Sequence, residues 1–148
     1  MELTLEQALQ KGIEAHKAGK VQEADRYYTA ILKAQPKHPD ANHNMGVLAV
    51  GVGKIEEALP FFKVALEVTS DIAQYWLSYI DVLIRLERIE DAKALFEQAK
   101  GKGLKGDAFN ALENRMNLVR KTVIANQDPP EEKLQALIKL HSLSLIHI

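Results

Sequence analysis

One spacing recurs along the chain and constrains its fold more than any other feature. An alanine occurs three times at an interval of 34 residues, and an aromatic residue occurs three times at the same interval. They are Ala24, Ala58 and Ala92, followed four positions later by Tyr28, Phe62 and Phe96, with Gly19 and Gly53 in step. A period of this length, with a small residue and an aromatic residue four apart, predicts an array of helical hairpins. Because no such hairpin can bury its apolar face alone, the hairpins must stack into one continuous core.

The period divides the chain into three repeats at residues 5–38, 39–72 and 73–106, each of which predicts two antiparallel helices. A stack of this kind needs a terminal helix with a polar outer face, and residues 107–124 are predicted to supply it. The apolar residues of this capping helix are Phe109, Leu112, Met116, Leu118 and Val119. The predicted fold class is therefore all-α, with one domain over residues 5–124.

Several residues predict where individual helices begin and end. Thr4 and Gln7 form a capping-box pattern at the first helix, and Gly19 supplies the left-handed turn that follows it. Pro36 stops the second helix, which we expect at residues 21–34, and Pro60 predicts a bend or a late helix start in the fourth. The stripe that the second helix is expected to bury consists of Val21, Ala24, Tyr28, Ile31 and Leu32.

With these residues in step, the chain resembles a tetratricopeptide repeat protein. The resemblance is carried by Met45, Gly46, Gly53, Ala58, Phe62 and Ala65 in the second repeat, and by Trp76, Ala92, Phe96 and Ala99 in the third. The departures from the family pattern are Lys11, Ile80, Glu87, Ser70 and Leu104, where leucine, two glycines and two prolines are usual. The resemblance implies a right-handed superhelix of antiparallel hairpins. It also implies that the first helices of successive repeats line a concave face that holds an extended peptide or a helix of a partner protein.

Projecting the period onto this sequence predicts which residues face the partner. The candidates are Gln10, Ile13 and Lys17 beside Glu6 in the first repeat, Asp40, His43, Asn44 and Val47 in the second, and Gln74, Leu77, Ser78, Asp81 and Arg85 in the third. Asn44 is the most suggestive, because an asparagine at the equivalent place in the family often holds a ligand's backbone amide. The alternative is that Asn44 is merely solvated.

One subtype of the family clamps the C-terminal carboxylate of heat-shock chaperones with a basic set of residues. The equivalent places here hold Leu9, Ile13, Asn44, Gln74 and Ser78, so only the asparagine is present. We therefore do not expect a carboxylate clamp. The mixed charges of the face favour a polar peptide of mixed charge or a short apolar helix.

Other functions are disfavoured by composition and motif. A formal net charge of −1 gives no field for nucleic acid or an anionic membrane surface, and the absence of cysteine excludes thiolate chemistry. His38, Asp40 and His43 fit no zinc spacing and instead begin a helix, for which Asp40 is the expected N-cap. We find no nucleophile, acid–base pair or cofactor loop, so the sequence predicts a binding module that is not an enzyme and has no cofactor or metal. No leader or membrane-spanning run is recognised, which indicates a cytoplasmic protein.

The last residues raise the question of what the chain is part of. Residues 125–131, with Pro129 and Pro130, predict a linker, and residues 132–142 predict the start of a further helix. This layout resembles the N-terminal region of bacterial multidomain proteins that join such repeats to a sulfo-, methyl- or O-GlcNAc transferase domain, which suggests a truncated chain. Residues 143–148 resemble a translated transposase end sequence, so we interpret them as adapter read-through rather than a native tail. Unpartnered array ends also suggest self-association.

Overall fold

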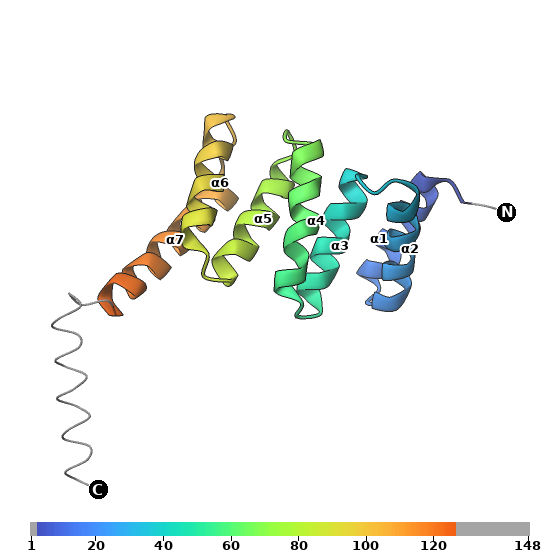
Figure 1. Ribbon diagram of the computed structural model, residues 1–148, viewed down its shortest axis with the longest axis horizontal. Helices are drawn as coiled ribbons and strands as arrows, with labels where there is room; N and C mark the ends of the chain where they lie inside the picture. Colours follow the sequence, from blue (N-terminus) through green and yellow to red (C-terminus); the bar gives the residue numbers. More distant parts are fainter. Residues whose placement is uncertain (1–2, 127–148) are drawn as a thin grey trace, which may run out of the picture.

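The protein is an array of antiparallel helices arranged side by side (Figure 1). The computed structural model describes residues 3–126, with side chains over 3–119; the predictions for the remainder of the linker, the further helix and residues 143–148 lie outside this range. The helices are α1 (Leu5–Lys17), α2 (Val21–Ala34), α3 (Pro39–Gly51), α4 (Ile55–Val68), α5 (Ala73–Arg85), α6 (Ile89–Gly101) and α7 (Asp107–Asn126). The predicted all-α superhelix of antiparallel hairpins is confirmed.

The helices keep the period of the sequence. First helices begin at Leu5, Pro39 and Ala73, and α7 begins at Asp107 in the same step of 34 residues. Helix α7 packs against α5 and α6, in the position that the first helix of a further repeat would take. It ends at Asn126, two residues beyond the predicted end of the capping helix.

The predicted ends of the first hairpin are confirmed in atomic detail. The Thr4 amide donates to Gln7 Oε1 at 2.9 Å, and the Gln7 amide donates to Thr4 Oγ1 at 3.0 Å, which completes the capping box. Gly19 adopts a φ of 77° in the turn, and Glu87, two repeats later, adopts a φ of 60°. Since Glu87 carries a Cβ, this left-handed conformation costs about 1 kcal/mol relative to glycine.

Two predictions about helix starts were wrong. Helix α4 begins at Ile55, so Pro60 lies inside the helix and does not delay its start, whereas the alternative, a bend at Pro60, stays a prediction. The N-cap of α3 is His38 rather than Asp40, because Pro39 occupies the first helical position and the Ala41 amide donates to His38 Nδ1 at 3.1 Å. The Asp40 carboxylate instead accepts a hydrogen bond from the Tyr75 hydroxyl of α5.

Each of the first two hairpins is closed by an aromatic ring packed on a glycine. A Cβ at Gly12 would lie 2.7 Å from Tyr28 Cε1, and one at Gly46 would lie 2.5 Å from Phe62 Cε1. The ring therefore occupies the space that a side chain would need. In the third hairpin Ile80 replaces the glycine and is fully buried beside Phe96.

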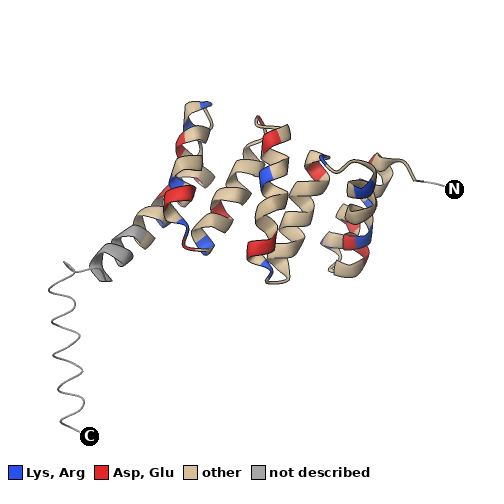
Figure 2. Cartoon of the chain, in the orientation of Figure 1, with Lys and Arg blue, Asp and Glu red and all other residues tan. Residues whose placement is uncertain are grey.

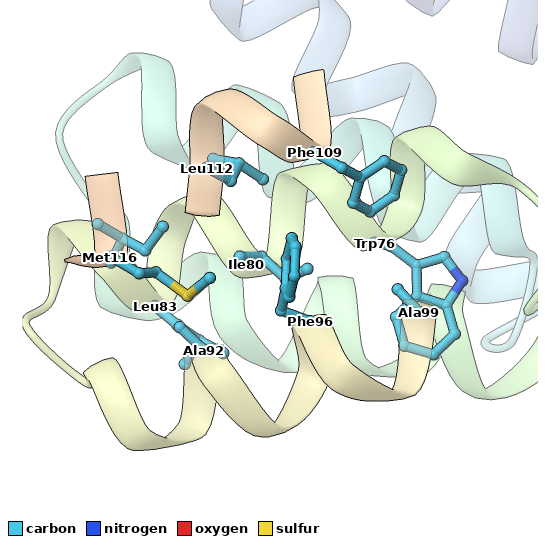
Figure 3. Packing of buried hydrophobic residues seen from close by; sticks show 10 residues of the cluster. Trp76, Ile80, Leu83, Ala92, Phe96, Ala99, Phe109, Leu112 and Met116 are labelled. Atoms are coloured by element: carbon cyan, nitrogen blue, oxygen red, sulfur yellow. The ribbon is translucent and has the colours of Figure 1, made fainter. Parts of the chain in front are cut away.

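The third hairpin and α7 share one apolar cluster (Figure 3). Its buried members are Trp76, Ile80, Leu83, Ile84, Ala92, Phe96 and Ala99 from the hairpin, and Phe109, Leu112 and Met116 from α7. Burying each large apolar side chain stabilises the fold by about 1.5–3 kcal/mol, so α7 is an integral part of the core.

Two residues of the predicted apolar stripes are exposed instead. Leu118 is 67% exposed, because it lies on the opposite side of α7 from the buried row of Phe109, Leu112 and Met116. Val21 is 38% exposed, because it stands at the first position of α2, at the outer end of the array.

Candidate functional site

The predicted partner-binding residues lie on the surface formed by α1, α3 and α5, which we call the first-helix face. Helix α1 contacts α3, α3 contacts α5, and α5 contacts α7, so the face is continuous. The exposed candidates are Glu6, Gln10, Lys17, Asp40, Gln74 and Arg85. The half-buried candidates are Ile13, Asn44, Val47, Leu77, Ser78 and Asp81, whereas His43 is buried.

Three of the candidates, His43, Ser78 and Asp40, take part in hydrogen bonds that join α3 to α5, and a fourth, Gln74, bonds to Ser78 within α5. His43 Nε2 lies 2.8 Å from Ser78 Oγ, and Gln74 Nε2 donates to the same oxygen at 3.1 Å. On the neighbouring turn, the Tyr75 hydroxyl donates to Asp40 Oδ1. These polar groups are already satisfied by one another, so a partner would have to replace existing bonds in order to use them.

His43 is enclosed by aromatic rings and is only 7% exposed. Its ring stacks on Tyr75 with a centroid distance of 4.7 Å and lies 5.5 Å from the ring of Phe62. Burial lowers the pKa of His43, an effect opposed by a hydrogen bond with Asn44 and by the charge of Asp40. Burial and the neighbouring Asp40 raise the pKa of Tyr75. The imidazole and the phenol therefore stay neutral at pH 7 and hold the two helices together.

A second cluster joins α5 to α7. Asp81 Oδ2 lies 3.0 Å from Arg85 Nε, and Asp81 Oδ1 also accepts from the guanidinium of Arg115. All three side chains are partly open to solvent, so each pair contributes at most about 1 kcal/mol. Positive and negative side chains are interspersed along the helices (Figure 2), as the small net charge predicts.

The first-helix face also includes three apolar candidates, Ile13, Val47 and Leu77. Ile13 and Val47 occupy equivalent positions on α1 and α3, and Leu77 lies one turn earlier in the repeat on α5. All three are half-buried, as is Leu9 on α1, so each keeps part of its side chain open to solvent. Asn44 lies on the same face, at the edge of the polar cluster of α3 and α5.

Two residues of these clusters, Tyr75 and Arg115, were absent from the predicted face. Tyr75 bonds to a residue 35 positions away, and Arg115 to one 34 positions away, so both contacts span one repeat. The period itself could have identified them, because residues one repeat apart on successive first helices are neighbours.

Two hollows of the described surface lie away from the first-helix face. One cavity of about 880 Å³ lies at the outer side of α1 and α2, and another of about 540 Å³ lies between α4 and α6. No candidate residue of the first-helix face lines either of them.

Among residues 3–126, no group of three or more His, Cys, Asp or Glu residues could hold a metal ion. Within the same range, no helix combines the length and the apolar character needed to cross a bilayer.

Comparison with known proteins places this arrangement in a family. The sequence profile described as "Tetratricopeptide repeat" matches residues 9–71 and again residues 43–111. No curated protein matches the chain by sequence. A tetratricopeptide repeat protein from Parabacteroides merdae has a similar structure, with a TM-score of 0.73 and 19% identity over 80% of this chain and 46% of that one. The chain therefore spans about half the length of that relative.

Two other solved structures are similar. The first TPR domain of Spaghetti (RPAP3), bound to the HSP90 peptide SRMEEVD, has a TM-score of 0.66 and 21% identity over 76% of this chain and 93% of that one. A mutant O-GlcNAc transferase from Thermobaculum terrenum has a TM-score of 0.60 and 21% identity over 67% of this chain and 20% of that one. At such identities the likeness concerns the fold alone.

Proposed function

The chain belongs to the tetratricopeptide repeat family, and on that premise we propose that it is a protein-interaction module without chemistry of its own. In this proposal the first helices form a concave face, the first-helix face, that holds a peptide or a helix of a partner protein. The partner is a protein rather than nucleic acid or a membrane surface, and the module acts in the cytoplasm.

The observation that carries the proposal is the apolar part of the first-helix face. Ile13, Val47 and Leu77 are half-buried on three successive first helices, so a partner can cover what remains exposed. Burying this apolar surface favours association, and because the helices that present it are already ordered, little of their conformational entropy is lost on binding.

The polar part of the face narrows the class of partner. Asp40, His43 and Ser78 are bonded within the face, which leaves fewer polar groups for a strongly charged peptide. The HSP90 peptide held by Spaghetti is acidic. Here Leu9 and Ile13 occupy places where the chaperone-binding members of the family have a lysine and an asparagine. We therefore propose an amphipathic helix or a short apolar segment as the partner, with Asn44 bonding its backbone.

Peptides selected on the wild-type chain from a random display library would test this proposal. Val47→Glu places a charge in the apolar part of the face, and Asn44→Ala removes the amide; both should weaken binding of the selected peptides at least tenfold. Val68→Glu on α4 is the matched control, because Val68 is already exposed and lies on another helix. Equal binding by Val47→Glu and wild type would place the partner elsewhere and refute the proposal.

A second candidate function is favoured by the similarity to the O-GlcNAc transferase, of which this chain covers 20%. In that case the module recruits protein substrates for a glycosyl-, sulfo- or methyltransferase domain encoded downstream. Sequencing the source gene beyond the codon of Leu140 tests it. A continuing frame that encodes a transferase domain would support this function, whereas a stop codon after Ile148 would rule it out.

A further inference from the structure

The outer side of the first hairpin carries an open apolar surface, which we call the N-terminal edge. A cavity of about 880 Å³ marks it. Its lining residues are Leu3, Leu5, Ala8, Glu23, Arg26, Tyr27, Ala30, Ile31 and Ala34. Leu3 is 44% exposed, Tyr27 is half-buried, and Ala30 and Ala34 are exposed, so the surface is apolar and accessible at once.

The equivalent surface of the third repeat shows what kind of neighbour the N-terminal edge can contact. Two repeats later, the positions of Tyr27, Ala30 and Ala34 are held by Leu95 and Gln98 of α6 and by Lys102, which follows that helix. Those residues line a hollow together with Lys63 and Leu66 of α4, so in the third repeat the same surface faces a neighbouring helix. Within the described residues, no helix occupies the corresponding place beside α1 and α2.

The opposite end of the array is not complementary to this surface. In α4 the side turned toward α6 carries Leu59, Lys63 and Leu66. The equivalent residues of α6 are Lys93, Glu97 and Lys100, all exposed. A charged side of this kind is unsuited to packing on an apolar surface. Head-to-tail stacking of two chains would bury these charges against the apolar N-terminal edge and is disfavoured.

The charges of the N-terminal edge instead complement those of the same edge on a second copy of the chain. Glu23 and Arg26 carry opposite signs one turn apart on α2, and neither has an ion-pair partner among the described residues. In a contact with two-fold symmetry, if Glu23 of the first copy contacts Arg26 of the second, then Arg26 of the first also contacts Glu23 of the second. The interface can therefore contain two identical ion pairs. The small side chains of Ala30 and Ala34 lie on the same side of α2 and allow two such helices to approach closely.

We propose that the N-terminal edge is a two-fold interface with a second copy of this chain. Two α2 helices cross there, Tyr27 and Leu3 bury their exposed parts, and Glu23 pairs with Arg26 across the axis. The contact leaves the first-helix face of each copy open, and it does not depend on the function proposed for that face.

Sedimentation equilibrium of the full 148-residue chain tests the interface. We expect a reversible dimer, weakened at least tenfold by Ala30→Glu. Ala94→Glu is the matched control, because Ala94 is an exposed alanine at the position in α6 that Arg26 has in α2, and it should leave the dimer unchanged. Since Ala30 is exposed, neither substitution should unfold the monomer, and circular dichroism checks this.

The ion pairs provide a sharper test. Glu23→Arg or Arg26→Glu alone should weaken the dimer, because like charges then meet across the axis, and the double exchange should restore it. A wild-type chain that stays monomeric up to millimolar concentration overturns the proposal. So does a dimer that Ala30→Glu leaves intact, or one that the double exchange fails to restore.

Discussion

The contact between Gly46 and Phe62 gives the most exacting test of how the hairpins are packed. In Gly46→Ala the new Cβ would lie 2.5 Å from Phe62 Cε1 and 2.7 Å from Cδ1, about 1 Å closer than ordinary contact. Phe62 is buried against His43, so the ring has little room to move. Overpacking of this kind costs about 1–3 kcal/mol, and the better helix propensity of alanine returns about 1 kcal/mol. Because the contacts are so short and the ring is enclosed, we take the upper part of that range, about 2–3 kcal/mol, which leaves an expected net loss of about 1–2 kcal/mol in the free energy of unfolding.

Urea unfolding followed by circular dichroism measures this loss. Gly51→Ala is the matched control, because Gly51 ends the same helix and a Cβ there would meet no atom within 4 Å. It should leave stability unchanged or raise it slightly. Phe62→Leu should relieve the clash, so Gly46→Ala should lose less stability in that background than in wild type. Equal losses in both backgrounds, or a neutral Gly46→Ala, would refute the assignment of this contact as a tight one.

Three further predictions concern single side chains. Trp76→Phe removes the indole donor that bonds the Ser70 carbonyl at 2.9 Å and should lower the free energy of unfolding by about 1 kcal/mol in urea titrations; an unchanged midpoint would contradict this. Glu87→Gly relieves the positive φ and should raise stability by up to about 1 kcal/mol, while Glu87→Ala should not; equal effects of the two would exclude backbone strain as the cause. The pKa of His43 is lowered by burial, so its contribution to stability is complete above pH 6.5 and declines as the pH falls through the folded value. Thermal melting at pH 7.5 and 5.0 should therefore show a smaller acid loss for His43→Gln than for wild type.

Much of this fold is predictable because it repeats. The interval between Ala24, Ala58 and Ala92 sets the three hairpins, and the helices begin within a few residues of where that interval places them. The prediction of the α3 N-cap failed because two neighbouring residues both suit that position. His38 and Asp40 can both cap a helix, and the proline between them decides for His38, since Pro39 is best placed at the first helical position.

The candidate site was less predictable than the fold. The period predicted which helices form the face. It did not predict which side chains of the face form hydrogen bonds with one another. His43 was expected to meet a partner, yet it is buried between Phe62 and Tyr75. A period tells which way a side chain points, whereas its burial depends on the size of neighbours contributed by other helices. The partner-binding roles of the face stay predictions.

One position shows where the division between sequence and structure lies. Asn42 and Trp76 are 34 residues apart and chemically unlike, so the sequence marks the position but suggests no common role. In the structure, Asn42 Nδ2 donates to the Pro36 carbonyl at 3.0 Å, and Trp76 Nε1 donates to the equivalent Ser70 carbonyl at 2.9 Å. By itself, then, the sequence determined the period, the class of fold and the order of the helices, because these follow from regular spacing along one chain. Only the tertiary structure decided which polar groups pair, which rings sit on glycines and which end stays apolar, because those outcomes depend on atoms brought together from different repeats.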